Sequence, residues 1–313
     1  MATTTSPQTS SDFRKLLDGR ISKVMRDTME YPGFNKMVPN LYRVENSGQA
    51  WEEFLSVPGL PNIPKHVGRL TFRGRSPGYH IRIEHAEFAM ATSIERKLMD
   101  DEKYGVMSET AKELVVAGER TREHLGARPF QNAFSAAFDH MVEHEEGLSL
   151  CSNSHTSRSG VSTATGFDNL GTSALNKTSL SAARLLMRRF RDDIGYLVNG
   201  GDEFILLVPE SLYQTATELV QSAQEVGTAN NTMNFHKSRY EVMTWNLLDD
   251  VSTTNWFLID KAMMKKFLLW FNRIQTENRM FMDDYTFETI FRTYFRLSYG
   301  FTNWRWIVGH QVS

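Results

Sequence analysis

The sequence predicts an α+β fold. Helical stripes and strand-like runs are mixed along the chain without the regular order of parallel α/β proteins. Apolar strand patterns occupy residues 204–208, 239–248 and 254–260, and alternation with a period of two returns over 286–297. The composition, with 41% hydrophobic and 12% aromatic residues, can fill a substantial core. A chain of 313 residues is long enough for two linked domains.

Charge, cysteine content and hydropathy exclude several classes of protein. The formal net charge of −2 gives no overall attraction for nucleic acid or for an anionic membrane. The single cysteine, Cys151, cannot form a disulfide within the chain. No apolar run approaches the ~20 residues of a membrane-spanning helix, and the Ser/Thr-rich start lacks the features of a signal peptide. We therefore expect a soluble, cytosolic chain with no membrane partner and no cofactor.

The first 64 residues predict an arm rather than part of a compact domain. Residues 1–11 contain no charged side chain, and 13–29 carry an amphipathic helical stripe that needs a partner surface. Residues 31–64 hold five prolines and few periodic runs, which is unusual inside a compact domain. We expect this region to lie on another surface.

Residues 66–97 predict an extended ribbon. Apolar and polar residues alternate at 70–72 and again at 81–83, and Ser76-Pro77-Gly78 between them supplies a turn. A ribbon with so few strands is unstable alone and needs a neighbour in the same chain or in another. Its arginines favour a solvated or partner-facing surface over a nucleic-acid patch. These arginines are Arg69, Arg73, Arg75 and Arg82.

The middle of the chain predicts helices and one long loop. Residues 104–126 carry an apolar helical face with Gly126 as the C-cap, and 129–144 also have a helical pattern. Residues 147–178 are rich in Ser, Thr, Gly and Asn, and loops of this length usually carry function or contact a partner. Two further helical stripes follow, at 180–194 and 211–226.

Three segments of the second half carry a resemblance to a known family. They are a buried strand that runs through a proline into a helix (204–212), a second strand (255–260) and the ending from Tyr299 to Trp306. In this order they resemble the C-terminal half of tailed-phage major capsid proteins, which include the Mu-like major head subunits and relatives with the Hong Kong 97-type fold. The resemblance covers roughly residues 100–313.

The resemblance implies a shell subunit in five parts. Trp304, Arg305 and Trp306 would lie in the closing strand of its peripheral domain. Because a strand has a period of two, both indoles would anchor the core of that domain, and Arg305 would make a polar or intersubunit contact from the other face. The five parts would be an N-terminal arm (1–60), an extended loop (61–97), a peripheral domain with a spine helix (98–147), an axial domain (148–261) and the C-terminal strands of the peripheral domain (262–313).

The resemblance also implies a structural role, without enzyme activity. The chain would assemble with itself as hexamers and pentamers into an icosahedral shell that encloses double-stranded DNA non-specifically. We expect separate scaffold and portal proteins, a place for a decoration protein, assembly in the host cytoplasm and a final location in the virion. Some relatives crosslink subunits through a lysine in the extended loop, but residues 73–79 contain none, which favours non-covalent assembly. The candidate subunit-interface residues are Arg69, Arg73, Arg75, Arg82 and Arg305.

Two alternatives stay open. An encapsulin-type nanocompartment has the same architecture and carries protein cargo. A zinc hydrolase would use His140, Glu143 and His144, which fit the pattern H-x-x-E-H on a helix, with the imidazoles on zinc and the carboxylate activating water. The sequence offers no third ligand for this zinc. Cys151 and His155 could form a nucleophile pair, but the sequence shows no orienting carboxylate, and a turn with an incidental thiol is the favoured interpretation.

Overall fold

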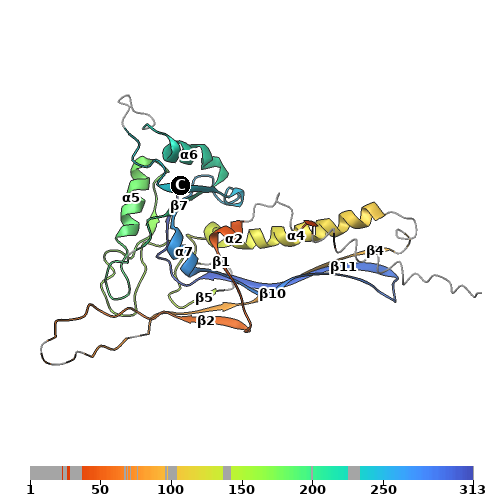
Figure 1. Ribbon diagram of the computed structural model, residues 1–313, viewed down its shortest axis with the longest axis horizontal. Coiled ribbons are helices and arrows are strands. Elements are labelled where there is room, and N and C mark those ends of the chain that lie inside the picture. The colour runs from red at the N-terminus through yellow and green to blue at the C-terminus, as the bar shows by residue number, and fades with distance from the viewer. Residues whose placement is uncertain are drawn as a thin grey trace, which may run out of the picture. The chain divides into compact units, whose positions relative to one another are not determined.

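The computed structural model describes residues 37–312 apart from short gaps, together with residues 23, 27 and 28. The chain mixes helices and strands, so the predicted α+β class is confirmed (Figure 1). It divides into two compact units, of which the first contains 1–36, 86–123 and 272–297 and the second contains 37–85, 124–271 and 298–313. The gaps are 67, 69, 71, 76, 96, 98–103, 137–141, 199 and 225–232.

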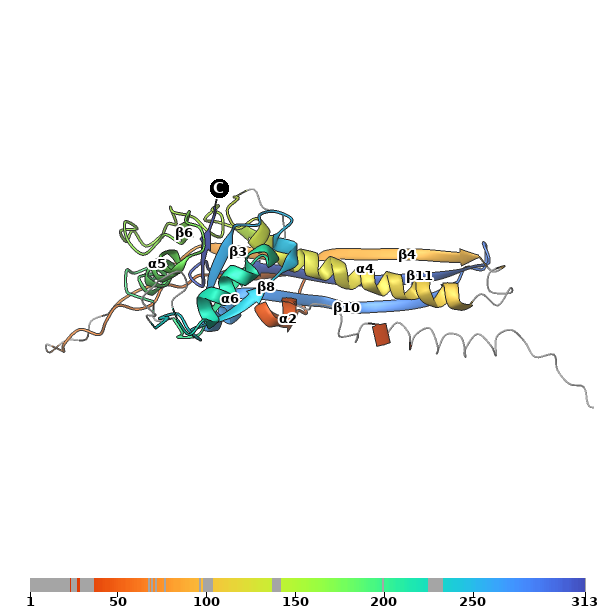
Figure 2. The same ribbon diagram turned by 90° about the horizontal axis from the view of Figure 1, so that it is seen from above.

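In the first unit a helix lies along a sheet of antiparallel strands (Figure 2). The helix is α4 (Tyr104–Gln131), which belongs to this unit up to Glu123. The sheet has the strand order β1-β10-β11-β4, of which β4 and most of β10 and β11 belong to this unit, whereas β1 belongs to the second unit. Arg122 of α4 donates hydrogen bonds of 3.1 Å to Asn272 and to Thr276 of β10. Side chains of β11 alternate between half-buried and buried, which confirms the predicted period of two. The strands are β1 (Arg43–Asn46), β10 (Leu268–Met282), β11 (Glu288–Phe301) and β4 (Ala86–Glu95).

Helix α4 continues past the end that the sequence predicted at Gly126. In the second unit, short helix α2 (Met37–Leu41) packs so closely on α4 that a Cβ at Gly126 would lie 2.4 Å from Cγ2 of Val38. The Gly126 carbonyl also accepts a 2.7 Å hydrogen bond from the Tyr42 hydroxyl. The glycine is therefore needed for close helix packing and not for a C-cap.

The second unit contains a five-stranded sheet with the order β6-β12-β9-β7-β8. Every residue of β7, β9 and β12 is buried. This confirms the strands predicted at 204–208 and 254–260 and explains their continuous apolar runs. The sheet strands are β6 (Leu170–Gly171), β12 (Ile307–His310), β9 (Trp256–Asp260), β7 (Phe204–Val208) and β8 (Tyr240–Thr244). The remaining helices are α5 (Lys177–Arg188), η1 (Glu210–Leu212), α6 (Tyr213–Gln221), η2 (Asn246–Leu248) and α7 (Lys261–Phe267).

A three-stranded sheet in the second unit corrects three predictions. It has the order β2-β3-β5, with β2 at Trp51–Leu55, β3 at His80–Glu84 and β5 at Val142–His144. The predicted helix over 129–144 is therefore wrong, because its last residues are a strand that pairs with β3. Residues 37–55, expected to be irregular, form α2, β1 and β2. The predicted ribbon is not a hairpin of its own, since β3 pairs with β2 and β5 while β4 pairs with β11.

Candidate functional site

Residues 57–78, here called the exposed loop, join β2 to β3 and contain neither helix nor strand among their described positions. In Figure 1 this segment extends away from the two strands that it connects. The large apolar side chains that are described in it face solvent, with Ile63 at 96% and Phe72 at 89% exposure. Its charged side chains are all basic: Lys65, Arg69, Arg73 and Arg75. An uncovered apolar and basic segment of this kind is typical of a partner-binding surface.

Ser56 and Tyr79 form the root of the exposed loop. The Ser56 amide donates to the Tyr79 carbonyl at 3.0 Å, and the Gly78 amide donates to the Ser56 carbonyl at 2.7 Å. The close approach requires glycine, because a Cβ at Gly78 would lie 2.8 Å from Ser56 Cβ and from its carbonyl oxygen. The two ends of the loop are therefore joined to each other even though the loop itself has no ladder.

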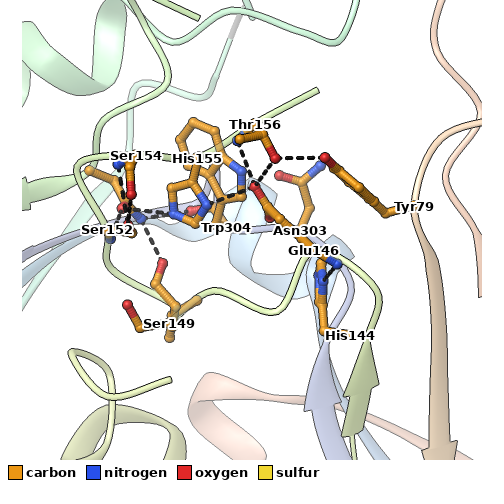
Figure 3. Close-up of polar contacts among 12 residues, drawn as sticks. Tyr79, His144, Glu146, Ser149, Ser152, Ser154, His155, Thr156, Asn303 and Trp304 are labelled. Carbon is orange, nitrogen blue, oxygen red and sulfur yellow. Dashed lines mark hydrogen bonds and ion pairs between the residues drawn. The ribbon is translucent and has the colours of Figure 1, made fainter. Parts of the chain in front are cut away.

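The Tyr79 end is tied to a buried ion pair (Figure 3). The Tyr79 hydroxyl lies 2.6 Å from the Thr156 hydroxyl, and the Thr156 amide donates to Oε1 of Glu146 at 2.7 Å. The same carboxylate oxygen lies 3.2 Å from Nδ1 of His155, and both side chains of this pair are almost fully buried. Burial alone would raise the pKa of Glu146, but the hydrogen bond and charge of His155 together hold it below the ordinary glutamate value.

The Ser56 end is tied to a second carboxylate. Oδ2 of Asp193 accepts a 3.3 Å hydrogen bond from the Ser56 hydroxyl, and Oδ1 accepts a 2.9 Å bond from Nη2 of Arg305. Nε of Arg305 donates to the Arg191 carbonyl at 2.6 Å. The Asp193 carbonyl accepts bonds from the hydroxyls of Ser157 and Ser159. Asp193 thus joins two other stretches of chain, residues 157–159 and Arg305, to the end of the exposed loop.

Trp304 lies between these two ion pairs. The His155 ring is parallel to the indole, with centroids 4.2 Å apart and an interplanar angle of 6°. The guanidinium carbon of Arg305 lies 4.5 Å from the centroid of the same indole. Cations over an indole face are stabilised by the ring quadrupole, most strongly when they are desolvated. We call Glu146, His155, Asp193, Trp304 and Arg305 the root cluster.

The structure corrects the prediction made for the C-terminal aromatic run. Trp304, Arg305 and Trp306 lie in a turn between β11 and β12 rather than in a strand, and all three are buried. Arg305 cannot alternate to an exposed face, and its guanidinium is paired inside its own chain at only 5% exposure. The predicted polar contact of Arg305 is therefore present, and in the single subunit it is made with Asp193 of the same chain.

The other predicted interface arginines are placed in two settings. Arg73 and Arg75 lie in the exposed loop, and Arg69 lies outside the described residues. Arg82 lies on β3, where it pairs with Glu84 at 2.5 Å and covers the Trp51 ring at 4.5 Å.

The described residues of the zinc-hydrolase pattern do not lie on a helix. Glu143 and His144 are neighbours on strand β5, so their side chains point to opposite faces, and His140 lies outside the described residues. Burial lowers the pKa of His144. Within the described ranges, no group of three or more His, Cys, Asp or Glu side chains is placed to hold a metal ion.

The Cys151–His155 pair also has a structural explanation. Cys151 is buried, and burial raises the pKa of its thiol, which disfavours the reactive thiolate. His155 instead contacts Glu146 and the Oδ1 atom of Asn169, each at 3.2 Å. The root cluster was therefore missed from the sequence, where His155 was considered only with the nearby thiol.

Comparison with known proteins decides the family. The sequence matches the phage capsid protein family over residues 81–309. The chain belongs to this family. No curated protein matches it. In the part of the chain that is described, no helix has the length and apolarity to cross a bilayer.

Solved structures show that this capsid protein has the Hong Kong 97-type α+β capsid fold. The capsid of an empty GTA particle has a TM-score of 0.53 at 9% identity, over 88% of this chain and 89% of that chain. The mature capsid of bacteriophage PhiM1 has a TM-score of 0.54 at 10% identity, over 87% and 85%. A virus-like particle from Pyrococcus furiosus has a TM-score of 0.50 at 9% identity, over 94% and 98%.

The predicted role as a major capsid protein of a tailed phage is confirmed, and the encapsulin-type alternative is not favoured. The capsid protein is a structural component of the virion and assembles with itself into a shell.

Proposed function

We propose that this capsid protein forms hexamers and pentamers that close into an icosahedral shell around double-stranded DNA, and that the exposed loop holds neighbouring copies together. The observation that carries the proposal is the solvent exposure of Val57, Leu60, Ile63, Leu70 and Phe72 on one segment without a core of its own. Covering such side chains contributes roughly 1.5–3 kcal/mol each as an upper bound. A stable interface needs about 1,000 Å² of buried area, which one loop reaches only together with other contacts.

The charge of the loop indicates what it meets. Four basic residues and no acidic residue lie between Val57 and Tyr79, so the surface that receives the loop is expected to be acidic or neutral. The proposed interface arginines are Arg69, Arg73, Arg75, Arg82 and Arg305. The absence of a lysine from residues 73–79 supports non-covalent contacts.

Electron microscopy of the full chain tests the role of the exposed loop. The double variant Ile63→Asp/Phe72→Asp places charges on two side chains that the proposal buries against a neighbouring copy. It should give dispersed subunits or capsomers in place of closed shells. Its matched control, Ile63→Leu/Phe72→Leu, keeps the apolar character and should still form shells. Closed shells from the aspartate variant at the wild-type protein concentration would overturn the role of the loop.

The remaining parts of the functional scheme are proposals of the same kind. They rest on the five-part subunit, with the arm at 1–60, the extended loop at 61–97, the peripheral domain at 98–147 and 262–313, and the axial domain at 148–261. We propose that separate scaffold and portal proteins act with it in the host cytoplasm, that a decoration protein can bind outside, and that DNA contacts inside are non-specific. Nuclease-resistant genomic DNA in purified particles would support this; an enzyme cargo would contradict it.

We also propose that the chain has no catalytic activity. Glu143 and His144 lie on a strand, which supports this proposal because the zinc-hydrolase mechanism needs both imidazoles on one helix face. His140→Ala should leave shell yield and metal content unchanged. Stoichiometric zinc that is lost in His140→Ala, together with peptidase activity, would revive the hydrolase.

A further inference from the structure

A group of cations lies between helix α5 and the turn that leads into strand β8. Lys177, Arg184 and Arg188 are seven and four positions apart along α5, so they share one face of the helix. The Ser181 hydroxyl on the same face lies 3.1 Å from Nε2 of His236, a buried residue of the turn. This contact places the cations of α5 beside the turn.

Aromatic rings hold the arginines of this group in position. The guanidinium carbons of Arg184 and Arg188 lie 5.6 and 5.2 Å from the centroid of the Phe204 ring. In the turn, the guanidinium carbon of Arg239 lies 4.2 Å from the centroid of the exposed Phe235 ring. A ring face attracts a cation through its quadrupole but carries no net charge. The rings therefore orient these guanidinium groups without neutralising them.

Positive charge exceeds negative charge around this group. The carboxylates just before β7 and on β8 are already paired. These pairs are Asp202 with Arg188, and Glu203 and Glu241 with Lys261. Among the residues that the structure describes, no carboxylate forms an ion pair with Arg184 or Arg239. Two oriented guanidinium groups thus remain without a counter-charge in the described chain.

The charges of the group act on the same two buried side chains. Burial lowers the pKa of His236. The charges of Lys177, Arg184 and Arg239 lower the same pKa, and a hydrogen bond to the Lys177 backbone opposes them. Burial raises the pKa of Tyr240, whereas the charges of Arg184 and Arg239 lower it. Cations from α5 and from the turn therefore converge on one small region of the second unit.

We propose that Lys177, Arg184 and Arg239 form a phosphate-binding site between α5 and the turn before β8. A phosphate group presents several acceptor oxygens around one centre, which match the planar fork of arginine. Cations that converge on one region suit such a group better than a row of separate carboxylates. Guanidinium groups that are already oriented also lose less conformational entropy on binding.

The phosphate has two possible sources, the backbone of DNA or a free phosphate compound. The DNA source deepens the proposed function and rests on it, whereas the site itself belongs to the subunit whether or not shells form.

A ³¹P NMR titration of inorganic phosphate into the full, unassembled chain at constant ionic strength tests the site. Arg184→Gln/Arg239→Gln should bind phosphate about tenfold or more weakly, because two charge-assisted donors are lost. Arg184→Lys/Arg239→Lys keeps both charges without the fork and should bind with intermediate affinity. The matched control Arg43→Gln/Arg279→Gln removes two arginines that are paired with glutamates of their own chain, and it should bind as the wild type does.

Titrations with a short double-stranded DNA and with polyglutamate identify the source of the anion. If the DNA backbone supplies the phosphate, Arg184→Gln/Arg239→Gln should bind DNA more weakly. The slope of its log K against log salt concentration should also be shallower by about 1 to 2. An unchanged affinity for DNA, together with weaker binding of inorganic phosphate, would support the site and assign it to a free phosphate compound.

Three results would overturn the phosphate site. They are no phosphate binding by the wild type, wild-type phosphate affinity in either Arg184/Arg239 double variant, and tighter binding of polyglutamate than of DNA and inorganic phosphate. The last result would indicate an acidic protein partner instead. Because every titration uses the unassembled chain, a failure of the full chain to form shells would count against the proposed function and leave these results unchanged.

Discussion

The exposed loop (57–78) and its two flanking residues, Ser56 and Tyr79, are continuous in the chain but differ in their surroundings. The apolar side chains of the loop face solvent, whereas the flanking residues are hydrogen-bonded to other parts of the subunit. The exposed loop contains neither helix nor strand among its described positions and leaves Ile63 and Phe72 in solvent. Its root is hydrogen-bonded to Asp193 directly and to Glu146 through Thr156, and the side chains paired with these two carboxylates contact the buried indole of Trp304. A segment without its own core can keep a defined direction when its ends are fixed this firmly. We therefore expect the root to be part of the folded subunit, and the exposed loop to be covered only when subunits assemble.

The largest effect is expected from Trp304→Ala, which removes the ring that both cations contact. Truncating a buried tryptophan costs about 3–5 kcal/mol, and here it also leaves His155 and Arg305 beside a cavity. Thermal unfolding of the full chain should show a Tm lower by roughly 10 °C. Trp304→Phe, which keeps an aromatic face, should lose less than half as much. An unchanged Tm in the alanine variant would mean that the root does not depend on the indole.

Glu146→Gln should have an intermediate effect, because it keeps the shape of the side chain and removes the charge opposite His155. We expect a loss of about 1–3 kcal/mol in the free energy of unfolding at neutral pH, from denaturant titration. The folded-state pKa of Glu146 is lowered, so its contribution is present at neutral pH and is lost as the pH falls through that value.

Wild-type stability should therefore fall more steeply with acid than that of Glu146→Gln. The exposed Glu143 of β5 provides a control, since Glu143→Gln should keep the wild-type slope. Equal slopes of unfolding free energy against pH for the wild type and both variants would show that the charge of Glu146 does not stabilise the root cluster.

The smallest effect is expected from Arg73→Ala/Arg75→Ala in the exposed loop. Exposed charges contribute about 0.2–1 kcal/mol each and are screened by salt. Assembly, followed by light scattering, should need a several-fold higher protein concentration at low salt, with no change in the Tm of the subunit. Arg73→Lys/Arg75→Lys keeps the charge and should assemble as the wild type does. A lower Tm in the alanine variant would show that the loop belongs to the subunit core.

Local sequence patterns predicted the regular parts of this fold well. The apolar runs of β7 and β9 and the alternation along β11 are short-range signals, and the structure confirms them. The end of α4 was predicted wrongly because Gly126 is required by α2, which packs on it from far away in the chain. Such a contact leaves no local pattern in the sequence.

The root cluster was hidden from the sequence for the same reason. Arg305 and Asp193 are 112 positions apart, and Ser56 is a further 137 positions from Asp193. The period of two at Trp304-Arg305-Trp306 predicted opposite faces, whereas a turn buries all three side chains. Only His155 carried a local signal, as a titratable residue in a serine-rich loop, and its partner Glu146 lies nine positions away.

Hydrogen exchange compared between dispersed capsomers and closed shells tests the division between loop and root most directly. We predict that amides of the exposed loop exchange rapidly in capsomers and become protected on assembly. Amides at 152–158 and 191–196, which surround the root cluster, should be equally protected in both forms. A loop that is already protected before assembly, or a root that gains as much protection as the loop, would contradict this division.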